Sequence, residues 1–204
     1  MRIRRTVAGA LLTSAAAWGL SGCAKVEQRN EDVGRVGILT ELTRDPDATA
    51  SAPLSPMGGS RVEGTVTFAQ YGSIVIVRAK VVGLPPHGDY GLHVHQARNC
   101  SAVAEAGSGG HFNPGDAPHG RHGTCAHHAG DLPNLRADGE GNAGNSFDSR
   151  MLSIGAGQAS VIGRVVVVSS NADDYKTQPD GNSGKPLACG FIRLDGRPFA
   201  APTR

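Results

Sequence analysis

The sequence predicts an all-β fold, an antiparallel sandwich or barrel, on three observations. Short runs of β-branched residues recur from residue 61 onward, and in several of them apolar and polar residues alternate. Turns rich in glycine and proline separate these runs, and no segment shows a convincing helical period. Runs of this length and period are typical of antiparallel strands, and they argue against a mainly helical fold.

Five segments are expected to form the strands. In chain order they read V-E-G-T-V-T-F-A, I-V-I-V-R-A-K-V-V, Y-G-L-H-V-H, S-V-I-G-R-V-V-V-V and L-A-C-G-F-I-R-L. From roughly residue 95 to residue 146 the chain is rich in glycine, proline, histidine and aspartate, and no strand is expected there. An insert of this length in a compact domain is usually functional.

The N-terminal residues 1–23 resemble an export signal. Three arginines lie among the first five residues, an apolar stretch follows, and Leu20-Ser21-Gly22-Cys23 forms a small-residue cleavage site. The apolar stretch is too short to span a bilayer comfortably. The cleavage site also resembles a bacterial lipobox, in which the cysteine, here Cys23, is lipidated; the alternative is a plain signal peptide. Either reading predicts an exported protein of the periplasm or cell envelope, and acyl chains would anchor it without spanning the membrane.

Residues 24–59 are expected to form a flexible linker between this anchor and a domain at residues 60–200. Proline, alanine, serine and glycine dominate the end of the segment and leave little to bury. The net charge of the chain is only +2, which is too small to neutralise many phosphates, so no nucleic-acid partner is expected.

Export also determines how the cysteines are interpreted. If Cys23 carries lipid, then Cys100, Cys125 and Cys189 remain. In an oxidising compartment two of these should pair, but their spacing does not say which two. The third is then a free thiol, a metal ligand or an intermolecular link.

A histidine-rich segment predicts a metal site. In L-H-V-H, His93 and His95 are two residues apart, so in a strand both imidazoles leave the same face and can share one ion. G-G-H-F-N-P, P-H-G and H-H-A-G-D-L then add further histidines and an aspartate. Imidazole nitrogens with one carboxylate suit zinc or copper. A histidine-rich scavenging tract is the alternative, but it would not need these spacings or the framing strands.

Seven motifs together resemble the copper/zinc superoxide dismutases in order, spacing and sequence, over residues 60–197. They are G-L-H-V-H, C-S-A, G-G-H-F-N-P, H-H-A-G-D-L, G-R-V-V-V-V, D-D-Y-K-T-Q-P and L-A-C-G-F-I. The resemblance implies a flattened, eight-stranded Greek-key β-barrel, related to the immunoglobulin-like sandwich, with long metal-binding and electrostatic loops. It also implies superoxide or copper ions as partners, and it allows either a monomer or a homodimer.

The resemblance assigns a complete zinc site and its supports. Its zinc ligands are His111, His119, His128 and Asp131. Asp173 matches the aspartate that links a zinc-site histidine to a copper-site histidine. Cys100 and Cys189 match the intrasubunit disulfide of the family, which would leave Cys125 spare.

The copper site departs from the family at two positions. His93, His95 and His111 match three copper ligands, whereas the fourth position holds Ser169, with no histidine after His128. The family also has an arginine, three residues before the last cysteine, that guides superoxide to copper and hydrogen-bonds it. Pro186 occupies that position and has neither charge nor side-chain donor. Lys185 beside it could attract an anion, but without the planar fork of arginine.

The sequence therefore predicts an exported superoxide dismutase-like metalloprotein with an intact zinc site and an altered copper site. Dismutation would be weak or lost, and copper binding or delivery becomes a candidate role. Two alternatives remain: an active dismutase with an open three-histidine copper site, and a zinc-only envelope binding module. A substitute copper ligand could come from His87, His122, His127 or Cys125.

Overall fold

A computed structural model describes residues 45–105 and 110–196. The expected signal segment and Cys23 lie outside the described residues, as do the last residues of the expected domain. No helix among the described residues has the length and hydrophobicity needed to cross a bilayer.

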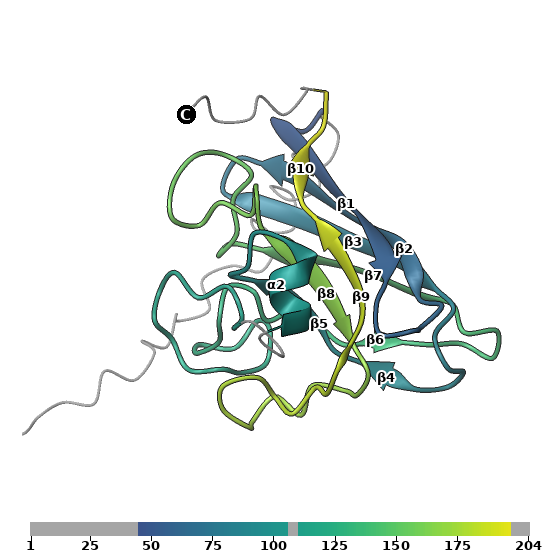
Figure 1. Ribbon diagram of the computed structural model, residues 1–204. Coiled ribbons are helices and arrows are strands. Elements are labelled where there is room, and N and C mark those ends of the chain that lie inside the picture. Colours follow the sequence, from purple (N-terminus) through teal and green to yellow (C-terminus); the bar gives the residue numbers. More distant parts are fainter. Residues whose placement is uncertain (1–44, 106–109, 197–204) are drawn as a thin grey trace, which may run out of the picture.

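The described chain forms a curled antiparallel sheet of eight strands (Figure 1). The strands are β1 (Ala48–Pro56), β2 (Glu63–Tyr71), β3 (Ile74–Val82), β5 (Leu92–His95), β7 (Ala143–Ser149), β8 (Val165–Ser169), β9 (Pro186–Phe191) and β10 (Arg193–Leu194). Their order is β5-β8-β9-β1-β2-β3-β7, and β10 pairs with β1. β4 (Asp89–Tyr90) and β6 (Leu135–Arg136) form a separate pair, and α2 (Cys100–Glu105) is a short helix. The predicted eight-stranded, barrel-like all-β fold is confirmed.

The linker prediction is wrong for its last part, because β1 occupies residues 48–56. Along β1 the side chains of Ala50, Ala52 and Leu54 are buried and alternate with more exposed residues. The strand pairs with β2 over most of its length and reaches β9 at its end. Alanine, serine and proline gave no strand signal, and β1 forms because it pairs with β2 on one side and β9 on the other. The domain therefore begins before residue 60.

The core follows from alternation along the strands. In β3, Val75, Val77, Ala79 and Val81 are buried, whereas the side chains between them face outward. Such alternation is expected of a strand with one face on the core.

β8 is different, because all of its residues are buried. Val166 and Val168 join the main core, whereas Val165 and Val167 pack in a second cluster with Val103 of α2. The uninterrupted valine run is therefore explained by burial on both faces of the strand.

A disulfide fixes α2 to β9. Cys100 and Cys189 are bonded with an S–S distance of 2.07 Å and a sequence separation of 89 residues. Closing a loop of this size typically contributes roughly 2–4 kcal/mol to stability. No cysteine in the described part of the chain is free, so the expectation that Cys125 is a spare thiol is wrong.

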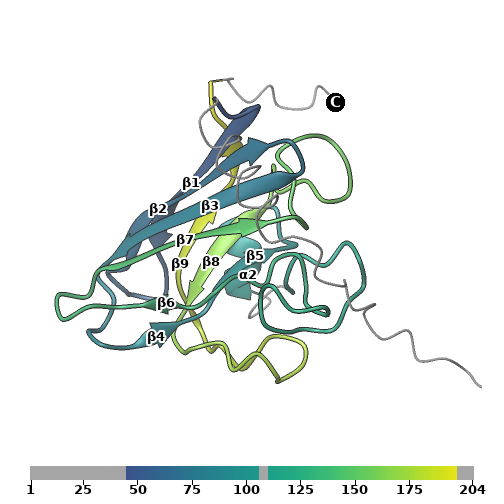
Figure 2. The same ribbon diagram turned by 180° about the vertical axis from the view of Figure 1, so that it is seen from behind.

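Two long loops project from the β5–β8 side of the sheet, away from β2 and β3 (Figures 1 and 2). The metal-binding loop comprises residues 110–134, and the electrostatic loop comprises residues 170–185 between β8 and β9. The segment expected to lack regular structure contains α2, β6 and the start of β7. Most of it is nevertheless loop, and both loops approach β5.

Candidate metal centre

β5 supplies the first two histidines of the centre. His93 and His95 are both buried and lie opposite Val167 and Val165 of β8. Residues directly opposite in an antiparallel pair share a face of the sheet. The two imidazoles therefore leave the same face of β5, as the L-H-V-H spacing predicts.

The metal-binding loop is held against the other edge of β5 by backbone hydrogen bonds. The amide of Val94 donates to the carbonyl of Gly130 at 2.9 Å, and the amide of Phe112 donates to the carbonyl of Val94 at 2.8 Å. A Cβ at position 130 would lie 2.2 Å from the Val94 carbonyl oxygen, so only glycine allows this approach. His111 and Asp131 consequently lie next to His95 and His93, respectively.

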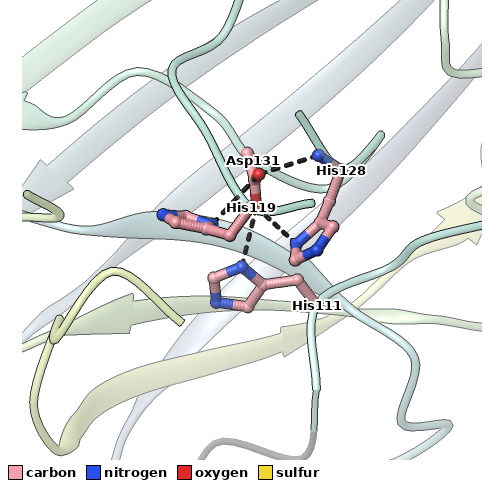
Figure 3. Close-up of side chains that lie close together, drawn as sticks. All are labelled: His111, His119, His128 and Asp131. Carbon is pink, nitrogen blue, oxygen red and sulfur yellow. Dashed lines mark hydrogen bonds and ion pairs between the residues drawn. The ribbon is translucent and has the colours of Figure 1, made fainter. Parts of the chain in front are cut away.

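Four side chains of this loop converge into the first cluster (Figure 3). They are His111, His119, His128 and Asp131, all buried, and their potential ligand atoms lie within 4.8 Å of one another. The Nδ1 atoms of the three histidines are 2.7 Å, 3.1 Å and 3.1 Å from the Asp131 carboxylate. Three imidazole nitrogens and one carboxylate form the closed, four-ligand set of a structural zinc site. The residues present therefore fit zinc.

His93, His95 and His111 form the second cluster. The rings of His93 and His111 stack with centroids 3.9 Å apart. His111 belongs to both clusters, because its Nδ1 contacts Asp131 while its Nε2 is buried without a hydrogen-bond partner. His93 Nδ1 is likewise buried without one. A buried polar atom left unpaired costs roughly 1–3 kcal/mol, so these nitrogens fit a second ion, and imidazole suits copper.

Asp173 connects the two clusters. Its carboxylate accepts from His93 Nε2 at 2.8 Å and from His119 Nε2 at 2.9 Å. A Cβ at position 181 would lie 1.9 Å from Asp173 Oδ1, and Gly181 has a φ of +66°. Only glycine can therefore cover this link. Asp173 therefore contacts one histidine of each cluster and fixes the orientation of both rings.

Two amide side chains that the sequence analysis did not identify bind the loops together. Gln178 accepts a hydrogen bond from the amide of His119 at 2.8 Å and donates to its carbonyl at 2.9 Å. Asn134 makes a similar reciprocal pair with the backbone of Asp173, both bonds being 3.0 Å long. Gln178 lies in the family-like motif D-D-Y-K-T-Q-P, so that motif could have identified it. The residues around Asn134 in the sequence form no such motif.

Burial and hydrogen bonding set the protonation of the centre. Burial lowers the pKa of His93 to about 4 in spite of its bond to Asp173, so this ring is neutral at pH 7. Burial also disfavours the charged form of His119, but its bonds to Asp131 and Asp173 prevail and raise its pKa to about 9. Burial opposes the charged form of Asp131 as well, yet bonds from His111 and His119 hold its pKa well below the usual range. Zinc binding at pH 7 must therefore displace a proton.

Ser169 and Pro186, the two positions at which the resemblance implies a departure, pair with each other. Ser169 ends β8 and pairs with Pro186 at the start of β9, beside a register shift between Val168 and Ser169. Ser169 is only 4% exposed, and its amide donates to the carbonyl of Gly91 at 2.9 Å. Both residues therefore lie where β8 ends against β9, and β8 pairs on its other side with β5, which carries His93 and His95.

None of the proposed substitute ligands joins the second cluster among the described residues. The two metal-type clusters found there contain neither His87 nor His122, His127 or Cys125. His122 and His127 lie against each other instead, with ring centroids 5.4 Å apart. The alternative of a substitute ligand therefore finds no support among the described residues, where the second cluster has three imidazoles.

Comparisons with known proteins agree with this geometry. The family described as copper/zinc superoxide dismutase (SODC) matches residues 62–192. Superoxide dismutase [Cu-Zn] 2 of Aquifex aeolicus is 32% identical over 160 residues, covering 76% of this chain and 93% of the relative. Superoxide dismutase [Cu-Zn] of Deinococcus radiodurans is 37% identical over 146 residues, covering 65% of this chain and 78% of the relative.

A second kind of relative is also found. The copper chaperone for superoxide dismutase of Rattus norvegicus is 34% identical over 190 residues, covering 87% of this chain and 66% of the chaperone. The family's cofactors are copper and zinc, and the two histidine clusters can hold both. The fold, the shared histidine, the bridging aspartate and the matched profile lead to one conclusion: the chain belongs to the copper/zinc superoxide dismutase family.

Proposed function

We propose that this chain is an exported, lipid-anchored family member that holds zinc in the first cluster and copper on the three histidines of the second. Its role is to bind or deliver copper, with little or no dismutation of superoxide. The observation that carries this proposal is the pair Ser169 and Pro186, which stand opposite each other where the family has a copper ligand and a substrate-guiding arginine.

The residues of the second cluster support retention of copper. Copper, when bound there, supplies one-electron redox chemistry between its two oxidation states. Asp173 holds the His93 ring so that Nδ1 faces the cluster, and Asp131 holds His111 so that Nε2 does. A site of only three imidazoles favours the reduced ion, which accepts low coordination numbers, and turnover needs both oxidation states.

The residues at the end of the ladder support the loss of rate. The Ser169 hydroxyl is neutral at pH 7 and a poor copper ligand, and Pro186 cannot donate to an anion. The neighbouring cation, Lys185, is exposed and acts as a point charge without a bidentate fork. An arriving superoxide ion therefore receives weaker guidance, and steering is what brings such reactions toward the diffusion limit.

A copper-handling role is also supported by the relatives, since copper chaperones for superoxide dismutase match most of this chain. A three-ligand site holds an ion with one position open, which favours transfer to a partner.

Metal analysis combined with a rate measurement tests this function. After growth in medium containing copper and zinc, we expect one zinc and at least one copper per chain, and pulse radiolysis should show dismutation far below the diffusion limit. A near-diffusion-limited rate would instead establish the active-dismutase alternative. One zinc without copper would establish the zinc-only module.

Export and anchoring have their own test. The Cys100–Cys189 disulfide favours an oxidising compartment, as the signal segment does. We expect the full chain to sediment with membranes and the Cys23→Ser chain to remain in the soluble fraction, because the acylated side chain is removed. Ser55→Ala, at an exposed position of β1, is the control and should sediment with membranes. Equal distribution of the Cys23→Ser and unaltered chains would overturn the lipid anchor.

A further inference from the structure

Two histidines of the metal-binding loop belong to neither metal cluster. His122 and His127 lie in the segment between the zinc-cluster residues His119 and His128. Their rings are tilted against each other with centroids 5.4 Å apart. The segment between them, residues 123–126, is exposed.

The hydrogen bond of His122 fixes its tautomer. Its Nε2 lies 2.8 Å from the carbonyl oxygen of Asp148, and because a carbonyl can only accept, Nε2 carries the proton. The ring also packs edge-on against Phe147 of β7, with centroids 5.0 Å apart. The other nitrogen, Nδ1, is buried without a hydrogen-bond partner, so it is the atom that can offer a lone pair to an ion.

The hydrogen bond of His127 fixes the opposite tautomer. Its Nδ1 donates to the carbonyl of His128 at 2.7 Å, and the side chain is buried. Its Nε2 is unprotonated and receives only a long hydrogen bond, 3.4 Å, from the amide of Gly123. Because this hydrogen bond is long and therefore weak, little free energy is lost when Nε2 binds a metal ion instead.

Both rings thus have the arrangement that metal-binding histidines usually show, in which one nitrogen donates to a backbone carbonyl and the other offers its lone pair. Bonds from a metal to imidazole nitrogen are about 2 Å long, so rings at this separation can both reach one ion. The carbonyls of Asp148 and His128 orient the pair before any ion arrives.

We propose that His122 and His127 form a third metal site, which binds copper(I). Structural zinc requires four ligands, and no carboxylate is hydrogen-bonded to either ring in the described structure. Two imidazole ligands are sufficient for copper(I), which accepts low coordination numbers. Because the segment between the two histidines is exposed, the ion can enter and leave there without opening the buried clusters.

Two substitutions remove the ligand nitrogens and keep the structural hydrogen bonds. In His122→Gln the new amide can donate from the position of Nε2, and in His127→Asn from the position of Nδ1. His87→Asn is the matched control: His87 is a histidine outside all three sites with a φ of 61°, a conformation that asparagine tolerates.

Copper(I) is titrated into the zinc-loaded full chain under ascorbate, with bicinchoninate as the competing chelator. We expect two equivalents for the unaltered chain and for His87→Asn, and one for the His122→Gln, His127→Asn double variant. The His95→Gln chain should retain the one equivalent of copper(I) that His122 and His127 bind. X-ray absorption should show this copper ion with two nitrogen ligands. A retained zinc content of one per chain shows that each variant is folded.

The proposal is overturned if the His122→Gln, His127→Asn double variant still binds two equivalents of copper(I). It is also overturned if the unaltered chain binds only one equivalent and the His95→Gln chain binds none. If the double variant fails to hold zinc, the single variant His122→Gln gives the same readout farther from the zinc ligands. A single equivalent that is retained in His95→Gln would support the loop site and contradict copper binding by the second cluster, so the two proposals can fail separately.

Discussion

The double variant Ser169→His, Pro186→Arg is expected to dismute superoxide at least about a hundredfold faster than the unaltered protein, both loaded with copper and zinc. A single well-placed group that stabilises developing charge is typically worth about a factor of 10²–10³. The histidine supplies the fourth imidazole of the copper site, and the arginine supplies a fixed positive fork for the anion. Pulse radiolysis measures the gain.

The ladder of β8 and β9 also provides the control for this variant. Ser170 and Lys185 are the next residues outward, and the amide of Ser170 donates to the carbonyl of Lys185 at 2.8 Å. The variant Ser170→His, Lys185→Arg introduces the same residue types one position away and should leave the rate nearly unchanged. Equal gains in the two double variants, or none in the first, would show that some other change limits the reaction.

Asp131→Ala is expected to abolish tight zinc binding and to lower the free energy of unfolding by about 4 kcal/mol or more when zinc is present. Asp131 is the carboxylate on which three histidines converge, and it also accepts from the amides of Gly120 and His128. An ion present at about a thousand times its Kd stabilises the folded chain by roughly 4 kcal/mol. Urea unfolding with and without zinc measures the difference.

Asp89→Ala is the matched control for this loss. Asp89 is an exposed carboxylate that forms an ion pair with Arg136 at 2.8 Å, and such surface pairs are worth about 0–1 kcal/mol. This variant should keep one zinc per chain and change the unfolding free energy by no more than about 1 kcal/mol. If Asp131→Ala retains one tightly bound zinc, or if zinc does not stabilise the unaltered chain, the assignment of the first cluster is wrong.

The parts of the fold that could be predicted were those with a strong local pattern. Alternation in β3 and the valine run of β8 identify strands directly from their side chains. β1 was missed because Ala50 and Ala52 are too small to produce a hydrophobic signal, and their burial depends on pairing with β2 and β9. That pairing is a property of the assembled sheet.

The candidate site was likewise predictable only in part. The L-H-V-H spacing alone places His93 and His95 on one face of a strand, and the resemblance supplies the remaining ligands. Asn134 and Gln178 could not be found because they act by reciprocal bonds to backbone groups brought close only by folding. The opposition of Ser169 and Pro186 depends on the irregular register at the end of β8, which no sequence pattern reveals.

The bridge made by Asp173 has a thermodynamic consequence for the order of metal loading. Hydrogen bonds and ion pairs link five buried side chains one after another: His93, Asp173, His119, Asp131 and His111. The stacking of His111 on His93 closes these contacts into a ring. An ion that orders the first cluster therefore also orders two nitrogens of the second cluster, one on His93 and one on His111. Thermodynamic linkage makes this coupling mutual. If bound zinc raises the affinity for copper by some factor, bound copper must raise the affinity for zinc by the same factor. The two sites should consequently load and empty as a cooperative pair.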